Sequence, residues 1–300
     1  MNIPQPVVDY CLAHGWGAIR RVTPLGGGCI NNASRLDTDH GPLFLKVNRS
    51  TPLDMFEREA EGLNALASAS LPSPSGRRAG GEGPRVPAVL CVGPDFILQE
   101  FIEPGPREGD RKGRPYWETL GVQLATMHKT TSPRFGFEHD NYIGSTPQVN
   151  TWEDDGYIFF AEHRIRFQAE LARRNNLLNI TDYRSLITVS NRLPSLIPPQ
   201  PASIIHGDLW SGNIHTGPDG EPVLIDPAAY YGWAEAELAM MTLFGSPPSS
   251  FFGAYESVHP LASGYTERFD LYNLYHLLNH LNLFGESYAG SVRAIIKRYT

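Results

Sequence analysis

Cysteine is scarce in this 300-residue chain, and long apolar runs are missing. Its three cysteines, Cys11, Cys29 and Cys91, are too few and too scattered for a disulfide framework or a closed zinc site. No apolar run approaches the roughly 20 residues that span a bilayer, and residues 1–10 lack the basic start and apolar stretch of a secretory signal. We therefore expect a protein of the reducing cytoplasm, with no membrane partner.

A basic excess is missing as well. The chain has 25 Lys and Arg against 32 Asp and Glu, which gives a formal net charge of -7. A nucleic-acid-binding surface needs an excess of positive charge, so we expect no nucleic-acid partner. What is present is a globular composition, with 41% apolar and 19% charged residues. The length suits one large domain or two smaller lobes.

The first hundred residues are rich in short apolar segments that read as strands. These strands are predicted over residues 21–25, 33–38, 43–47, 88–92 and 96–101. Apolar residues at helical spacing predict one helix among them, over residues 54–66. Residues 68–84 consist largely of Ser, Pro, Gly and Arg and have almost nothing to bury. We therefore predict a disordered insertion over residues 70–84.

After residue 103 the predicted elements are helices, the clearest over residues 117–129, 159–178 and 269–284. A strand-rich part followed by a helical part predicts an α+β fold with two lobes. The smaller, antiparallel-sheet N-terminal lobe spans residues 1–102, and the larger, mainly helical C-terminal lobe spans residues 103–300. Ligands usually bind in clefts between lobes, so we expect the site there.

The densest group of chemically active side chains lies in the segment His-Gly-Asp-Leu-Trp-Ser-Gly-Asn, residues 206–213. Asp208 and Asn213 stand in a D-x4-N arrangement, and Asp226 ends an apolar strand 13 residues later. Phosphoryl transfer needs a carboxylate beside the acceptor hydroxyl and oxygen ligands for Mg²⁺, which bridges the nucleotide phosphates. Asp208 suits the first role, and Asn213 with Asp226 suits the second. The His-Gly-Asp triplet alone also fits a capped turn, but the combined pattern favours phosphoryl transfer.

The N-terminal part supplies the groups that would hold a nucleotide. Lys46 lies in an apolar strand, where a lone Lys is costly unless it is paired, and Glu59 on the next helix is its expected partner. A strand Lys held by a helix Glu grips the α- and β-phosphates in protein kinases. A glycine run before these strands predicts a phosphate-covering loop, although it also fits a hairpin bend; it comprises Gly26, Gly27 and Gly28. The predicted adenine-binding hinge comprises Gln99, Glu100, Phe101 and Ile102.

At this point the chain resembles a bacterial member of the fructosamine kinase (ketosamine kinase-like) family, within the wider group of aminoglycoside- and choline-kinase-like phosphotransferases. The matching segments cover nearly the whole chain. They are residues 26–33, 55–60, 120–128, 140–148, 206–213, 226–232 and 270–280. Asn-Tyr-Ile-Gly-Ser (141–145) and Asp-Leu-Trp-Ser-Gly-Asn (208–213) are far more specific to this family than to kinases at large.

The resemblance implies a protein-kinase-like fold and ATP-dependent phosphorylation of the sugar 3-hydroxyl of a ketosamine, which eases release of the amine. It implies that Asp208 is the base, that Asn213 and Asp226 bind Mg²⁺, and that Lys46 and Glu59 hold the phosphates. The ring of Trp210 is placed either to stack on the sugar or to pack as a core aromatic under the loop. We expect His206 to brace the loop through hydrogen bonds rather than to transfer protons.

Cys29 directly follows the glycine run. A thiol near backbone N–H groups and Lys46 favours the reactive thiolate, whereas the alternative is a small apolar residue packed between strands. In relatives, a cysteine in this loop is associated with redox-sensitive dimerisation. The resemblance thus implies a monomer or a redox-dependent homodimer.

Two other functions stay open. A kinase of the same fold could act on an aminoglycoside, choline or a sugar, although the family-specific segments favour a small-molecule ketosamine or a glycated amine. A non-catalytic nucleotide-binding scaffold is the alternative from a different class. Loss of Lys46, Asp208 or Asp226 would have favoured the scaffold, and all three residues are present.

Overall fold

The computed structural model of the chain describes residues 3–26, 32–70, 83–106 and 116–300. Three predicted features therefore lie outside the described residues: Gly27 and Gly28 of the glycine run, Cys29, and residues 71–82 of the predicted insertion.

The N-terminal part is built on one antiparallel sheet of five strands in the order β1-β2-β3-β5-β4. Its strands are β1 (Ile19–Leu25), β2 (Asn32–Thr38), β3 (Gly41–Val47), β4 (Val89–Gly93) and β5 (Phe96–Glu100). The predicted strands are thus confirmed. Alternation along β3 sends Leu43, Leu45 and Val47 into a small core under helix α1 (Gln5–Ala13). Lys46 therefore points to the opposite face of the sheet, where it meets α2.

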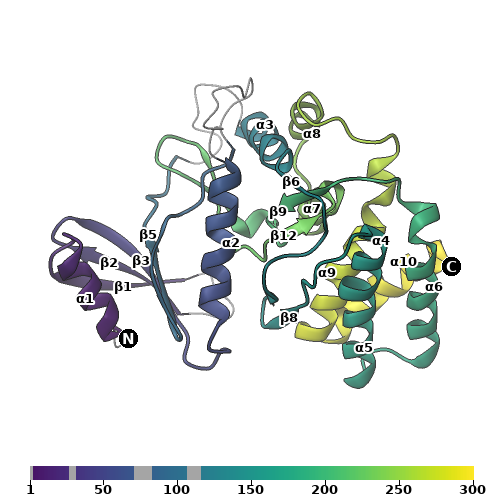
Figure 1. Cartoon of the computed structure of the whole chain (residues 1–300), viewed down its shortest axis with the longest axis horizontal. Helices are drawn as coiled ribbons and strands as arrows, with labels where there is room; N and C mark the ends of the chain where they lie inside the picture. The colour runs from purple at the N-terminus through teal and green to yellow at the C-terminus, as the bar shows by residue number, and fades with distance from the viewer. Residues whose placement is uncertain (1–2, 27–31, 71–82, 107–115) are drawn as a thin grey trace.

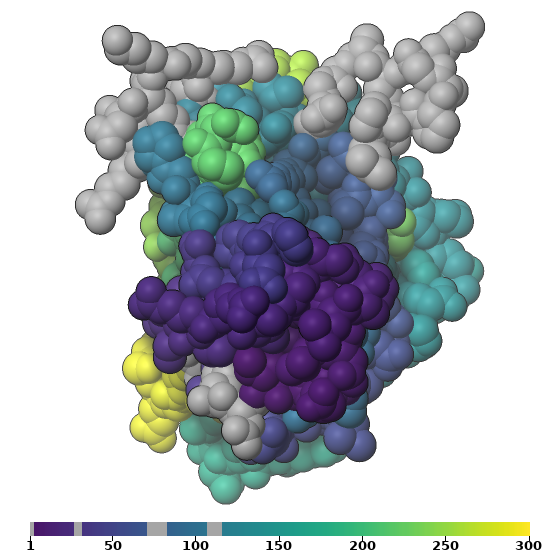
Figure 2. All heavy atoms as spheres, turned by 90° about the vertical axis from the view of Figure 1, so that its left-hand side faces the viewer, coloured from purple at the N-terminus to yellow at the C-terminus, as the bar shows by residue number. Residues whose placement is uncertain are grey.

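Helix α2 (Met55–Ser70) lies between the sheet and the helical part of the molecule (Figure 1). Its buried side chains, Phe56, Leu63 and Leu66 among them, belong to the same apolar core as the helices that follow. The two parts therefore share a core across α2, whereas α1 and the first strands form the face that looks outward from the sheet (Figure 2).

The C-terminal part is mainly helical. Its α-helices are α3 (Tyr116–His128), α4 (Gly156–Phe159), α5 (Phe167–Arg174), α6 (Ile180–Leu196), α7 (Ala234–Leu243), α8 (Ser249–Glu256), α9 (Phe269–Phe284) and α10 (Ala289–Tyr299). Together the two parts form the α+β fold that we predicted. The division of the lobes between residues 102 and 103 stays a prediction. In the part of the chain that the structure describes, no helix combines the length and the apolar character that crossing a membrane requires.

The predicted helix over residues 159–178 is wrong as a single α-helix. The chain forms α4, then a π-helical stretch, η2 (Phe160–Arg166), and then α5, which ends at Arg174. The wider π turn carries Arg164, whose guanidinium is fully buried and donates to the carbonyl of Val149 at 2.6 Å. Asn176 then adopts a left-handed conformation with φ 58°, which turns the chain out of the helix.

Short strands between the helices carry the loops of the site. They are β6 (Thr131–Ser132), β7 (Asn141–Ile143), β8 (Thr146–Gln148), β9 (Ala202–Ile205), β10 (Ile214–Thr216), β11 (Pro222–Leu224) and β12 (Tyr230–Gly232), with the 3-10 turn η3 (Ser211–Asn213) before β10. Strand β9 pairs with β12 and β6, and β10 pairs with β11. Residues 206–213 therefore leave a buried strand, and Asp226 lies in the connection from β11 to β12.

Candidate active site

The loop that carries Asp208 is anchored by Glu237 of α7. This carboxylate is buried and accepts hydrogen bonds from the backbone N–H groups of His206, at 2.9 Å, and Gly207, at 2.8 Å. It also lies 3.0 Å from Nε2 of His128 in α3. Gly207 has φ 81°, and a Cβ there would lie 2.1 Å from the carbonyl oxygen of Ala228. Only glycine fits this approach, so the loop is held tightly against the chain that follows Asp226.

His206 braces the same loop, as expected from the sequence. The N–H of Asp208 donates to its Nδ1 at 3.2 Å, and its Nε2 lies 2.8 Å from the carbonyl oxygen of Ile225. A ring that accepts at Nδ1 and donates at Nε2 is the neutral tautomer, and burial lowers the pKa of His206 in agreement. The imidazole thereby ties the residue before Asp226 to Asp208.

Asn213 and Asp226 complete an oxygen-rich group around Asp208. The Nδ2 of Asn213 donates to the Asp208 carbonyl at 2.8 Å, so its Oδ1 is the atom that can meet a cation. The N–H of Ile225 donates to the Asn213 carbonyl at 3.1 Å, which places Asp226 beside this turn. Burial raises the pKa of Asp208 to about 8, and the negative charge of Asp226 adds to that shift. A cation between these groups would relieve their repulsion.

These donors fit Mg²⁺. Magnesium takes oxygen ligands and is usually held by one or two carboxylates together with substrate phosphates rather than by a cage of protein side chains. Within the described ranges, no group of three or more His, Cys, Asp or Glu lies together as a metal cage. The carboxylate of Asp226 is 43% exposed and so is open to such a shared ion.

Lys46 joins the N-terminal sheet to this group. Its Nζ lies 2.7 Å from Oε1 of Glu59, which confirms the predicted pair, and it also forms an ion pair with Asp226. Burial alone would lower the pKa of Lys46, but the charges of Asp226 and Glu59 outweigh it, so the pKa lies above its ordinary value. The side chain is therefore a buried cation held between two carboxylates. The contact with Asp226 is an addition that the sequence did not suggest.

The four predicted hinge residues are split by the end of β5. Gln99 is buried, and its Nε2 donates to Oε1 of Glu59 at 3.0 Å, so its side chain supports the Lys46 pair. The N–H of Glu100 donates to the Ala88 carbonyl at 2.9 Å and is thus already used. Phe101 and Ile102 follow the last strand residue and remain the candidates for adenine contacts.

The remaining predicted residues lie at the edges of the site. Gly26 is exposed at the end of β1, with open space where a Cβ would be. The side chain of Trp210 is not a core aromatic, because it is 38% exposed. Its ring packs edge-on against Phe244, with centroids 6.1 Å apart, and covers Gly212, where a Cβ would lie 2.3 Å from the indole.

Glu237 is the main residue that the sequence reasoning missed. The only local signal is an acidic residue within the apolar run Glu-Leu-Ala-Met-Met of α7, which suggests a buried carboxylate with a partner. Nothing in the spacing indicates that the partners are the His206 and Gly207 backbone groups.

Known structures place this fold in a class. The fold is similar to a putative fructosamine-3-kinase from Thermobifida fusca, with a TM-score of 0.83 and 32% identity over 99% of this chain and 100% of that chain. It is also similar in fold to a macrolide 2'-phosphotransferase type I, with a TM-score of 0.60 and 12% identity over 100% and 99% of the two chains. Fold and site together define a phosphotransferase of the protein-kinase-like class.

Sequence comparisons assign the chain to one family within this class of phosphotransferases. The family model for fructosamine kinase matches residues 12–300. A chloroplastic protein-ribulosamine 3-kinase from Arabidopsis thaliana is 41% identical over 98% of this chain and 87% of its own length. A probable ketoamine kinase from Enterococcus faecium is 35% identical over 93% and 95%. The chain belongs to the fructosamine kinase family, as the sequence motifs indicated.

Proposed function

We propose that this protein transfers the γ-phosphoryl group of ATP to the sugar 3-hydroxyl of a ketosamine. The observation that carries the proposal is the contact of Lys46 with both Glu59 and Asp226, beside the braced loop of Asp208. Family membership and the relatives named as ribulosamine and ketoamine kinases support the choice of acceptor. The resulting phosphate ester eases release of the amine, which is deglycation.

Each residue of the site has a proposed role in this reaction. Asp208 accepts the proton of the attacking hydroxyl, and a cation held beside it by Asn213 and Asp226 would keep its carboxylate ionised. Lys46, held by Glu59, binds the nucleotide phosphates. Asn213 and Asp226 would hold Mg²⁺, which supplies charge neutralisation at the phosphates. His206 and Glu237 keep Asp208 in place, and such fixed positioning is what phosphoryl transfer requires.

The acceptor sugar is proposed to lie on Trp210. Its ring is partly exposed two residues after Asp208 and is held by Gly212 and Phe244, so it is a preformed apolar platform. A sugar ring presents C–H groups on its faces, and an aromatic platform suits them. A free ketosamine and a glycated amine both satisfy this requirement.

The decisive experiment is an ATP-consumption screen with the purified chain and Mg²⁺. Acceptors are fructosamines, ribulosamines and erythrulosamines on amino acids and on protein, with an aminoglycoside, choline and free sugars as comparison. We expect turnover with ketosamines only, and ³¹P and ¹H NMR of the product should place the phosphate on the 3-oxygen. Turnover confined to an aminoglycoside, choline or a free sugar would show that this compound, and not a ketosamine, is the acceptor. No turnover with any acceptor would favour a non-catalytic nucleotide-binding scaffold.

Two further parts of the proposal concern the state of the protein. We propose a cytoplasmic location and a monomer that forms a disulfide-linked homodimer through Cys29 on oxidation. Mild oxidation should yield a dimer on non-reducing gels that a thiol reductant dissolves, and Cys29→Ala should abolish it. A dimer that persists in that variant contradicts the assignment.

A further inference from the structure

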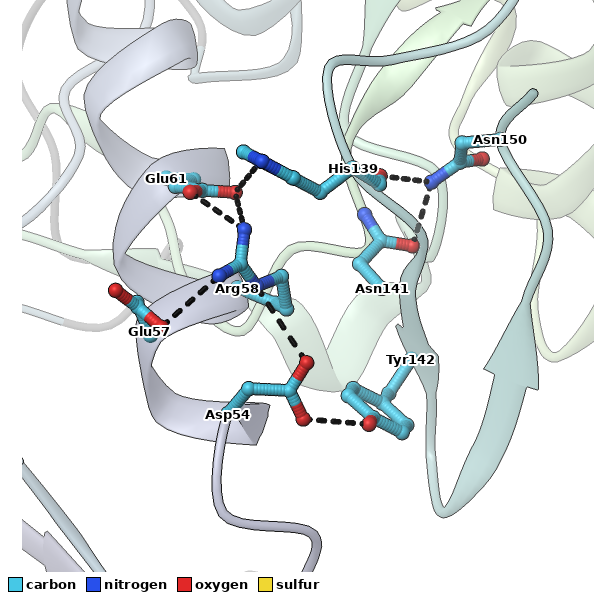
Figure 3. A network of polar contacts seen from close by, with 8 residues as sticks. All are labelled: Asp54, Glu57, Arg58, Glu61, His139, Asn141, Tyr142 and Asn150. Atoms are coloured by element: carbon cyan, nitrogen blue, oxygen red, sulfur yellow. Dashed lines mark hydrogen bonds and ion pairs between the residues drawn. The ribbon is translucent and has the colours of Figure 1, made fainter. Parts of the chain in front are cut away.

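A short hairpin of the C-terminal part touches both α2 and the chain after Asp226. It is formed by β7 and β8, and with its flanks it spans residues 139–150, here called the hairpin segment. Figure 3 shows His139 and Tyr142 pointing from this segment toward α2, and Asn150 bonded to Asn141 and to the carbonyl of His139.

On the α2 side, two polar contacts join the hairpin segment to Asp54, directly before α2, and to Glu61 within the helix. The hydroxyl of Tyr142 donates to Oδ1 of Asp54 at 2.7 Å, and Nδ1 of His139 lies 3.2 Å from Oε2 of Glu61. Arg58 connects the two acidic residues, because it donates to both oxygens of Glu61, at 2.6 and 2.7 Å, and lies 3.7 Å from Asp54 (Figure 3). The first two turns of α2 are therefore attached to the C-terminal part.

On the other side, two buried amides hold the chain just after Asp226. The Nδ2 of Asn141 donates to the carbonyl of Ala229 at 2.8 Å, and the Nε2 of Gln148 donates to the carbonyl of Ala228 at 3.0 Å. Asp226 itself has φ 56°, a left-handed conformation that is uncommon for a non-glycine residue, although Asp adopts it more readily than most, and that contacts around it help to hold. The two amides are among these contacts.

The amides are fixed in turn, so they donate in one direction. Oδ1 of Asn141 accepts from Gln148 at 2.6 Å and from Nδ2 of Asn150 at 3.0 Å. The hydroxyl of Tyr275 donates to Oε1 of Gln148 at 2.6 Å, and buried Arg164 donates to Oδ1 of Asn150 at 2.7 Å. With their oxygens occupied, the amide NH₂ groups face the two backbone carbonyls.

Helix α2 and the held chain also touch directly. A Cβ at Gly62 would lie 3.4 Å from both Pro227 and Ala229, so the helix backbone approaches the residues after Asp226 closely. The position of Glu59 relative to Asp226 thus depends on one packed unit, made of α2, the hairpin segment and residues 227–229.

We propose that the hairpin segment fixes the position of α2 relative to Asp226. It thereby holds Lys46 against the carboxylates of both Glu59 and Asp226. Tyr142 and Asn141 are the two positioning residues, one for each side. The inference rests on the proposed nucleotide site. It also gives a physical task to the Asn-Tyr-Ile-Gly-Ser motif, which the proposed reaction does not otherwise use.

Tyr142→Phe tests the α2 side, because it removes only the hydroxyl. The readouts are calorimetric affinities of the full chain for Mg-ATP and for adenosine. Loss of one hydrogen bond to a charged group predicts an Mg-ATP affinity that is weaker by about tenfold or more, whereas adenosine, which lacks phosphates, should bind unchanged. Tyr183→Phe is the matched control. It loses a similar 3.1 Å bond to Glu170, far from the site, and should alter neither affinity.

Variants of Asp54 test whether the Tyr142–Asp54 hydrogen bond is the contact that supports Mg-ATP affinity. Asp54→Asn keeps an oxygen acceptor and should bind Mg-ATP like the wild type. Asp54→Ala should weaken it at least as much as Tyr142→Phe does, because it also removes the contact with Arg58. The double variant Asp54→Ala/Tyr142→Phe should be no weaker than Asp54→Ala, because the tyrosine hydroxyl then has no bond left to lose. A role in overall stability alone would not give this pattern in nucleotide affinity.

Asn141→Asp tests the Asp226 side, because it replaces the NH₂ that faces Ala229 by an oxygen of the same size. It should weaken Mg-ATP binding at least as much as Tyr142→Phe. Asn273→Asp is the control, since buried Asn273 donates to the carbonyl of Ala239 at 3.0 Å in the same way but lies on α9.

The outcomes separate this inference from the proposed function. A wild type that binds Mg-ATP but phosphorylates no ketosamine refutes the acceptor, and the affinity comparison still decides the role of the hairpin segment. Equal Mg-ATP affinity in the wild type and Tyr142→Phe, or an equal loss of adenosine affinity, overturns the inference. A wild type that binds no Mg-ATP overturns both.

Discussion

Replacing Glu237 by Gln should separate the anchoring of the catalytic loop from the stability of its helix. The carboxylate accepts from His206 and His128 through Oε2, and from Gly207 through Oε1. An amide has one oxygen. If that oxygen keeps the first two donors, the new NH₂ faces the N–H of Gly207, and a buried donor loses its partner.

Losing one bond to a buried charge, with an N–H left unpaired, costs about 2–4 kcal/mol of unfolding free energy. For a chain of this length, an unfolding entropy of about 2.1 cal/mol/K per residue converts this into a fall in Tm of about 3–6 °C. The loop carries Asp208, and misplacement of a catalytic group by about 1 Å can cost on the order of 100-fold in rate. We therefore expect kcat to fall by about 10–100-fold.

Glu235→Gln is the matched control. Glu235 lies one half-turn earlier on α7, is equally buried, and is bound by Arg268 at 2.7 Å and Tyr272 at 2.9 Å rather than by the loop. It should lower Tm by a similar amount and leave kcat nearly unchanged. The assay is steady-state ATP turnover with a ketosamine, measured below both transitions, with Tm by calorimetry. A Glu237→Gln protein with lowered Tm and a wild-type kcat would refute the reasoning, and so would an equal loss of kcat in Glu235→Gln.

Three other variants test the remaining groups. Lys46→Ala should abolish most of the thermal stabilisation that Mg-ATP gives the wild type, because the buried cation of the phosphate site is lost; equal shifts in a thermal-shift titration would contradict its role. Asp208→Asn should cut turnover by roughly 10²–10⁴-fold. The same variant should also remove a pH dependence of the protein's stability. Because the pKa of Asp208 rises from 3.8 to about 8 on folding, its contribution is full below pH 4 and is lost as the pH climbs through 8. Metal-free wild type should therefore lose Tm relative to the variant over that range, and parallel curves would argue against the raised pKa. Gly212→Ala should displace the Trp210 ring, because the added Cβ would collide with it, and should raise KM for the ketosamine without changing Mg-ATP affinity. An unchanged KM would count against Trp210 as the platform for the sugar.

The sequence alone was enough to predict the groups whose relation is local. Asp208 and Asn213 are five residues apart on one turn, so their spacing already indicates that they share a site. Short apolar segments and turn residues predicted the strands of the sheet, and a segment rich in Leu and Tyr predicted α9 with its bounds, Phe269–Phe284, because each signal lies within the segment itself. The pairing of Lys46 with Glu59 followed from the cost of an unpaired charge in an apolar strand.

Tertiary structure decided what depends on contacts between distant segments. Lys46 and Asp226 are 180 positions apart, and their contact arises only when α2 packs between the sheet and the helical part. Glu237 appears in the sequence as one acidic residue in a helix, and its task is visible only once β9 has brought two backbone N–H groups to it. The hairpin segment is a recognisable motif, yet its use follows from touching α2 on one side and residues 228–229 on the other. Spacing along the chain encodes periodicity and turns, whereas hydrogen bonds between remote segments are selected by the packing of the whole core.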